Sequence, residues 1–177
     1  TAGSRMGRDL AFSSDGNYLA AFAEREAGRS LLLFDVLDKK LIRKIEMDVE
    51  QQHGPAFSPD GKTIAFTGNR GGQFDVFLLD LETEEVRNLT NDAPYDGSPV
   101  FSPDGQSLVF SVASGEDDAH LYRLDLAEPA KRYRMTEGDW RDKDATYATD
   151  GKNLVFTSDR RGTDNIYAMD LATGRVL

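Results

Sequence analysis

Short segments of alternating apolar and polar residues dominate this chain, and none has the spacing of an amphipathic helix. Residues 62–67 (Lys-Thr-Ile-Ala-Phe-Thr) alternate as a half-buried strand does, and residues 74–79 and 85–89 give two further strands. A Ser-Pro-Asp-Gly turn at 58–61 joins 62–67 to a short apolar strand at 55–58, because Pro presets φ and Gly accepts the left-handed conformation. The pattern predicts a four-stranded antiparallel meander.

The same pattern recurs along the chain with a nearly constant period. Phe-Ser-Pro-Asp-Gly stands at 57–61 and 101–105, with near copies at 12–16 and 147–151, so that the first residues are 45, 44 and 46 apart. A fixed period of this size is typical of propeller blades, in which each sheet buries its faces against its neighbours. The expected fold class is all-β, a β-propeller of four-stranded antiparallel blades. A β-sandwich is the alternative, but it needs no pentapeptide at constant phase.

Each remaining repeat supplies strands at matching positions. The predicted strands are 18–23, 30–34 and 41–45 in the first repeat, 107–112, 120–124 and 131–135 in the third, and 153–157, 165–169 and 175–177 in the fourth. The period also fits WD-like repeats, although no Trp-Asp dipeptide occurs.

Composition narrows the function classes. The formal net charge is -10, which argues against nucleic acid as a partner, and no apolar run is long enough for membrane insertion. Eight Asp residues at repeated turn positions account for most of this acidity. The chain has no cysteine, which excludes disulfides and thiolate chemistry. Because the chain opens with Thr1, residues 1–6 are interpreted as a cloning remnant or an unstructured start.

The segments that connect successive blades are the first candidates for function, because loops on a rigid scaffold commonly carry it. They are predicted at 46–54, 90–98 and 136–144. A gapless alignment places Gln52, Asp96 and Asp142 at one position, before the innermost strand. These residues either cap the connecting turn or form a ring of carboxylates at the channel mouth, able to hold a cation or an amine-bearing peptide.

The third connection contains Trp140, the only tryptophan of the chain. This ring is either an interface anchor or folded over the top of the blade. Calcium ligation by Asp139, Asp142 and Asp144 is weakly indicated, since the glycine and the closing glutamate of a calcium loop are missing.

Catalytic chemistry is not indicated. A Gly-x-Ser-x-Gly elbow is absent, and the two histidines, His53 and His120, have no pattern that brings them to a nucleophile and an acid. His53 is a candidate for ligand contact, whereas His120, which follows an acidic run at 116–118, is expected in a solvated loop. No catalytic residue, cofactor or metal is therefore predicted. The loops at 68–72 and 158–162 occupy the same position within their repeats, so Arg70 and Arg160 are expected to stabilise the blades by bracing neighbouring loops or an acidic turn.

Residues 57–67, 69–72, 75–83 and 87–92, together with 157–162 and 164–174, resemble TolB-type propeller repeats. The resemblance extends over the chain after about Gly7, as repeats at about 7–47, 53–90, 97–136 and 143–177. It implies a non-catalytic scaffold in the periplasm, or otherwise outside the cytoplasm of a bacterium. Such a scaffold recognises a protein or peptide at the propeller rim or channel mouth. The candidate contacts are His53, Tyr95, Asp96, Trp140, Arg141 and Asp142.

The same repeat occurs in propellers of prolyl oligopeptidase-like peptidases, so the alternative is a substrate-gating propeller whose hydrolase domain lies outside this chain. Propellers of this type usually have six or seven blades. Four repeats therefore favour part of a larger propeller, and an unclosed stack is expected to self-associate through its exposed faces.

Overall fold

The protein is described here by a computed structural model, which covers residues 10–25, 28–115 and 118–177. These residues form strands, turns and loops, and they contain no helix long and apolar enough to cross a membrane. The predicted start at 1–6 lies outside the described residues.

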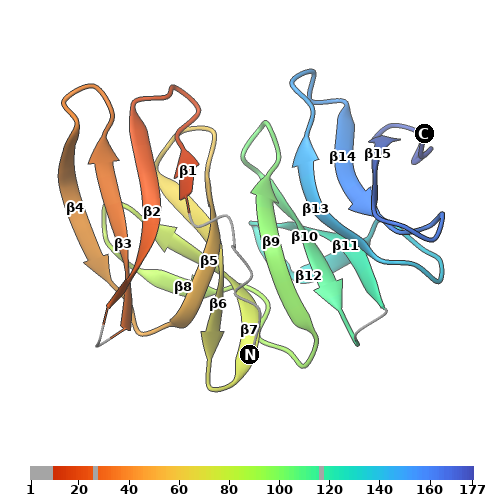
Figure 1. Ribbon diagram of the computed structural model, residues 1–177, viewed down its shortest axis with the longest axis horizontal. Helices are drawn as coiled ribbons and strands as arrows, with labels where there is room; N and C mark the ends of the chain where they lie inside the picture. The colour runs from red at the N-terminus through yellow and green to blue at the C-terminus, as the bar shows by residue number, and fades with distance from the viewer. Residues whose placement is uncertain (1–9, 26–27, 116–117) are drawn as a thin grey trace.

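Four antiparallel sheets lie side by side (Figure 1). We call them blades one to four. Blade one contains β1 (Leu10–Phe12), β2 (Tyr18–Arg25), β3 (Gly28–Asp35) and β4 (Lys40–Glu46). Blade two contains β5 (Glu50–Phe57), β6 (Thr63–Arg70), β7 (Gln73–Asp80) and β8 (Val86–Asn88). Blade three contains β9 (Tyr95–Phe101), β10 (Ser107–Ala113), β11 (Ala119–Asp125) and β12 (Glu128–Arg134), and blade four contains β13 (Asp142–Tyr147), β14 (Asn153–Ser158) and β15 (Asn165–Asp170).

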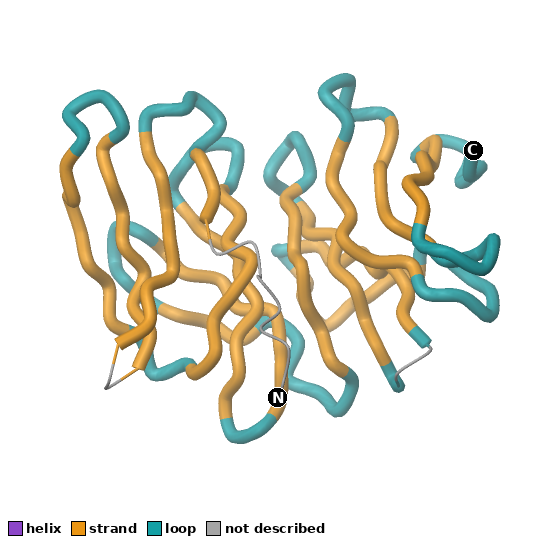
Figure 2. Tube along the Cα trace, in the orientation of Figure 1, coloured by secondary structure: helices purple, strands orange, loops and turns teal. Residues whose placement is uncertain are grey.

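Every sheet is a simple meander in which neighbours in sequence pair antiparallel. The first strands of successive blades contact one another, so β1, β5, β9 and β13 lie on the inner side of the stack. Loops gather at two opposite ends of the blades (Figure 2). One end carries the Asp-Gly turns, and we call it the turn rim. The other end, the crossover rim, carries the connections 47–49, 89–94 and 135–141 and the loops 71–72 and 159–164.

The core consists of three interfaces between successive blades. Phe22 and Leu31 of blade one pack against Phe66 and Phe77 of blade two, with the Phe22 and Phe66 ring centroids 5.5 Å apart. Equivalent clusters join blade two to blade three and blade three to blade four. Because a buried large apolar side chain contributes about 1.5–3 kcal/mol, neither face of a blade is stable without its neighbour.

The repeated turns also pack from blade to blade. A Cβ built at Gly105 would lie 3.4 Å from Pro59, and one built at Gly151 would lie 3.2 Å from Pro103. The turn glycines of blades three and four therefore sit against the proline of the preceding blade. Ser14 Oγ continues the series by donating a hydrogen bond of 2.7 Å to the Pro59 carbonyl oxygen.

The all-β class and the four repeats are confirmed, and two details differ from prediction. Residues 175–177 do not form a fourth strand; Val176 makes only an isolated bridge to Met169, so blade four has three strands. The innermost strands begin earlier than expected, because a bulge lets them continue to Glu50, Tyr95 and Asp142. The candidates His53, Tyr95, Asp96 and Asp142 consequently lie within strands.

Candidate functional site

The crossover rim is built on a bulge that repeats at the start of the innermost strands. Gly54, Ser98 and Asp144 are equivalent residues, and their φ angles are 61°, 54° and 53°. This left-handed conformation suits glycine and is costly for other residues. The bulge interrupts the strand register in β5, β9 and β13 and turns the preceding residue pair toward the rim.

Two residues before each bulge lie the aligned positions Gln52, Asp96 and Asp142. All three side chains are fully buried. Buried carboxylates need partners to offset their desolvation, and Asp96 and Asp142 have different ones. They therefore do not form an open ring of carboxylates at the channel mouth; both lie beneath the rim surface.

Asp142 is held by blade four's own loop. Arg160 Nη2 donates to Asp142 Oδ1 at 2.9 Å, and Trp140 Nε1 donates to Asp142 Oδ2 at 3.2 Å. The Arg160 guanidinium lies 5.1 Å from the Trp140 ring centroid and 4.7 Å from that of Tyr167. The predicted bracing role of Arg160 is confirmed. Arg70, at the same phase of blade two, donates to the Asp48 carbonyl oxygen at 3.0 Å.

Trp140 is half-buried and folded back on its own connection. A Cβ placed on Gly138, whose φ is 129°, would lie within 2.5 Å of the Trp140 ring atoms Cζ2 and Cε2. The ring therefore rests on the Gly138 backbone and under Arg160. Next to it, Arg141 donates from its backbone N and from Nε to the two oxygens of Asp159, at 2.7 and 2.8 Å. These hydrogen bonds, the backbone one first, hold the pKa of Asp159 below its ordinary value.

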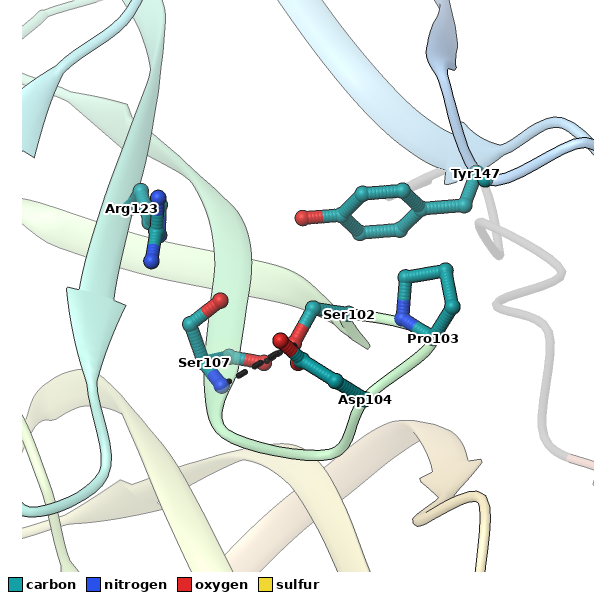
Figure 3. A pocket seen from close by; sticks show the side chains of 7 residues that line it. Ser102, Pro103, Asp104, Ser107, Arg123 and Tyr147 are labelled. Carbon is teal, nitrogen blue, oxygen red and sulfur yellow. Dashed lines mark hydrogen bonds between the residues drawn. The ribbon is translucent and has the colours of Figure 1, made fainter. Parts of the chain in front are cut away.

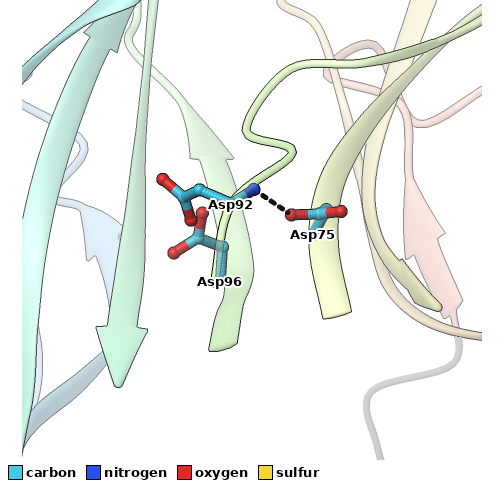
Figure 4. A group of neighbouring side chains, drawn as sticks. All are labelled: Asp75, Asp92 and Asp96. Atoms are coloured by element: carbon cyan, nitrogen blue, oxygen red, sulfur yellow. Dashed lines mark hydrogen bonds between the residues drawn. The ribbon is translucent and has the colours of Figure 1, made fainter. Parts of the chain in front are cut away.

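Asp96 lies in a denser cluster between blades two and three (Figure 4). Asp75 on β7, Asp92 in the connection and Asp96 on β9 have carboxylate oxygens within 4.8 Å of one another. Arg132 on β12 contacts Asp92 Oδ2 at 2.5 Å and Asp96 Oδ2 at 3.2 Å. The guanidinium already supplies the positive charge that a bound cation would bring, so we assign no metal to this cluster.

Three aromatic side chains lie together at the crossover rim between blades two and three. The His53 and Phe74 rings are stacked with centroids 5.8 Å apart, and Phe74 meets Tyr95 at 5.1 Å. Tyr95 Oη is 3.3 Å from His53 Nε2, which links blades two and three. Tyr95 is 36% exposed, so these three residues, which we call the aromatic patch, offer apolar surface at the rim.

The two histidines lie in different surroundings. His53 belongs to the aromatic patch. His120 is buried in β11, contrary to the expected solvated loop, and its Nε2 lies 2.8 Å from Asp118 Oδ1. The remainder of the acidic run, residues 116–117, lies outside the described residues.

A shallow pocket of about 240 Å³ lies at the opposite, turn rim (Figure 3). It is lined by Ser102, Pro103, Asp104, Ser107, Arg123, Tyr147 and Gly151. The Tyr147 ring crosses the pocket from blade four toward Arg123 of blade three (Figure 3). Burial raises the pKa of the Tyr147 hydroxyl, which disfavours its use as a base. The pocket is the seam between two neighbouring turns.

Comparison with known proteins agrees with this architecture. The family model described as TolB beta propeller domain matches residues 74–177. The chain belongs to this family. TolB from Acinetobacter baumannii is 26% identical with a TM-score of 0.80, over 95% of this chain and 42% of that one. A putative TolB from Agrobacterium tumefaciens is 22% identical with a TM-score of 0.79, over 96% of this chain and 63% of that one.

This chain therefore spans less than two thirds of the length of the TolB structures it matches. Proteins other than TolB share this fold. A structure from a study of two prolyl endopeptidases matches with a TM-score of 0.66 at 18% identity, over 94% of this chain and 27% of that one. At that identity the likeness concerns the fold alone.

Proposed function

We propose that this TolB-type propeller is a non-catalytic scaffold that binds a protein or peptide at the crossover rim, with the aromatic patch as the centre of contact. The observation that supports it best is the exposure of Tyr95 beside Phe74 and His53 on two rigid blades. Aromatic anchors of this kind are enriched in protein interfaces, because they bring large contact area at low entropic cost.

The buried charges beneath the rim support this role indirectly. Asp142 and Arg160 hold Trp140 in place, and Asp159 fixes Arg141. Arg141 is 37% exposed in its side chain and Trp140 is half-buried, so both present part of their surface at the crossover rim. Asp96 and Asp142 act as positioning residues, since their side chains are not accessible.

The site of action that we propose is outside the cytoplasm of a bacterium. Two TolB structures, each from a named bacterium, support it, and the lack of cysteine is compatible with an oxidising compartment. The gating propeller of a hydrolase is the alternative, and only the shared fold supports it.

Site-specific photo-crosslinking tests the proposal. A photoreactive amino acid replaces Tyr95 in one variant of the complete protein and Tyr133, which is exposed on the outer strand β12, in the control variant. We expect a discrete crosslinked protein from position 95 and none from position 133 in intact cells. Equal crosslinking from both positions would contradict a binding surface at the crossover rim.

A further inference from the structure

The Asp75–Asp92–Asp96 cluster holds more negative charge than its partners balance. Three carboxylates lie within 4.8 Å of one another, and Arg132 contacts two of them, Asp92 and Asp96. Asp75 and Asp96 are buried, so water does not screen their repulsion effectively. Two like charges at such a distance in a buried site are commonly relieved by a proton.

The three carboxylates differ in how well their negative charge is stabilised. Asp75 accepts hydrogen bonds from Thr90 Oγ1 at 3.1 Å, from Asn88 Nδ2 at 2.8 Å and from the Asp92 backbone N at 3.4 Å. Asp92 is partly exposed and makes the short contact to Arg132. Both carboxylates therefore have partners for their negative charge.

Asp96 is the exception. Its side chain is fully buried, its Oδ2 lies 3.2 Å from Arg132 Nη1, and its Oδ1 has no hydrogen-bond partner among the residues that the structure describes. A buried carboxylate oxygen without a donor is costly, whereas a protonated oxygen becomes a donor that a neighbouring carboxylate can accept. In Figure 4 the Asp96 carboxyl group faces that of Asp92.

We propose that the cluster is a proton-binding site, in which Asp96 carries a proton at neutral pH and donates it to an adjacent carboxylate of the cluster. No covalent bond other than the O–H bond is made or broken, and solvent supplies and receives the proton. Burial raises the pKa of Asp96 to about 7; the Thr90 side chain and Arg132 act against this rise, and the charges of Asp92 and Asp75 act with it.

The titratable groups on the other strands that pack against β9 do not change the assignment of the proton to Asp96. β10 carries no titratable side chain. The remaining charged or titratable groups of these strands are engaged elsewhere or exposed. They are Arg70 with the Asp48 carbonyl, Asp80 in its own turn, Asp142 with Arg160, Lys143 with Asp164, Asp144 with Ser98, Tyr147 in the turn-rim pocket, His53 with Tyr95, and Glu50 at the surface.

The effect on stability follows from the direction of the pKa change. As the pH rises, the unfolded chain releases the Asp96 proton at a lower pH than the native state does, because the ordinary pKa of Asp is 3.8. The contribution of Asp96 to stability is thus fully present below about pH 4 and is lost as the pH rises through about 7. Asp96→Asn replaces the carboxyl by a neutral group of the same shape, and it should remove this dependence.

The test compares the melting temperatures of wild type, Asp96→Asn and Asp142→Asn between about pH 5 and about pH 9. We expect the difference between Asp96→Asn and wild type to shift in favour of the variant as the pH rises, and to level off above about pH 7. Asp142→Asn is the matched control, because it occupies the equivalent buried position and both of its oxygens have donors. It should lower the melting temperature equally at both ends of the range.

A second measurement does not depend on the variants folding. The carboxyl carbon of Asp96 is followed by NMR in the wild-type chain, and we expect its chemical shift to titrate near pH 7. Titration below about pH 5, or a pH-independent difference between Asp96→Asn and wild type, would overturn the proposal. A calcium-dependent gain in melting temperature that Asp96→Asn abolishes would also overturn it, since the site would then bind a cation other than the proton.

Discussion

Ser98 Oγ donates a hydrogen bond of 3.1 Å to Asp144 Oδ1, and both residues have left-handed backbone conformations. They occupy the same position in blades three and four, where blade two has Gly54. The bond joins two bulges across a blade boundary directly at the crossover rim. It therefore stabilises two otherwise unfavourable backbone conformations and fixes the spacing of the innermost strands.

Two substitutions of Ser98 distinguish the effect of backbone strain on stability from the effect of this hydrogen bond. Ser98→Gly relieves a cost of about 1 kcal/mol and loses a hydrogen bond of about the same value, so the free energy of unfolding should change by less than about 1 kcal/mol. Ser98→Val places a β-branched residue at positive φ and should destabilise by about 1–3 kcal/mol. Urea unfolding measures both, and equal stability of the two variants would exclude strain at this bulge.

Arg160 is expected to be the most sensitive charged residue of blade four. Arg160→Ala leaves the fully buried Asp142 carboxylate without its cation and should cost about 3–5 kcal/mol. Arg160→Lys restores the charge but not the planar stacking on Trp140 and Tyr167, so its loss should be smaller. The exposed Arg175→Ala serves as a control with an expected change within about 0.5 kcal/mol. A loss no larger than that of this control would contradict the bracing role.

Trp140 should contribute to stability as well as to the rim surface. Trp140→Ala removes the ring from the Gly138 backbone and from Arg160, and we expect a loss of about 2–3 kcal/mol. Trp140→Phe keeps a ring and loses only the Nε1 donor to Asp142, which should cost about 1 kcal/mol. Circular dichroism must follow the unfolding, since both variants remove the only tryptophan. An unchanged melting temperature for Trp140→Ala would instead identify a pure interface anchor.

The turn aspartates should make the protein sensitive to acid. Ser58 Oγ donates to Asp60 at 2.6 Å and Ser102 Oγ donates to Asp104 at 2.5 Å, and these bonds, followed by backbone N–H donors, lower the pKa of both carboxyl groups. Their stabilisation is present above the ordinary Asp value of 3.8 and is lost as the pH falls through the lowered values.

The melting temperature should therefore fall below about pH 4, and the fall should be smaller in Asp104→Asn than in wild type. The matched variant Asp164→Asn changes an exposed carboxylate paired with Lys143 outside the turns, and it should retain the wild-type acid response. An identical acid response of wild type and Asp104→Asn would contradict a stabilising turn carboxylate. This acid dependence has the opposite sign to that of Asp96, so the two effects are separable on the pH axis.

The repeat period and the turn chemistry were sufficient to predict the blades. Pro59, Asp60 and Gly61 fix a turn by local geometry alone, and that geometry recurs wherever the same residues recur. The bulge at Ser98 could not be predicted in this way, because a serine at positive φ carries no local signal. As a result, Asp96 was expected ahead of the innermost strand, and it lies within β9.

The contacts of the candidate site were predictable only where they repeat. Arg160 and Arg70 share a phase, which indicated their bracing role. Arg132 lies on the outer strand β12, 36 residues after Asp96 in the sequence. The repeat pattern did not indicate an arginine next to Asp96. Phe74 was missed for a similar reason: it reads as an ordinary strand residue until His53 and Tyr95 are brought beside it.

The affinity of the crosslinked partner for rim variants tests binding at the crossover rim most directly. Tyr95→Ala should weaken binding at least about tenfold, which corresponds to about 1.4 kcal/mol, while Tyr133→Ala on the outer strand should leave the affinity unchanged. Circular dichroism would confirm that both variants are folded. Equal affinities of the two variants for the partner would contradict the assignment of the aromatic patch as the binding surface.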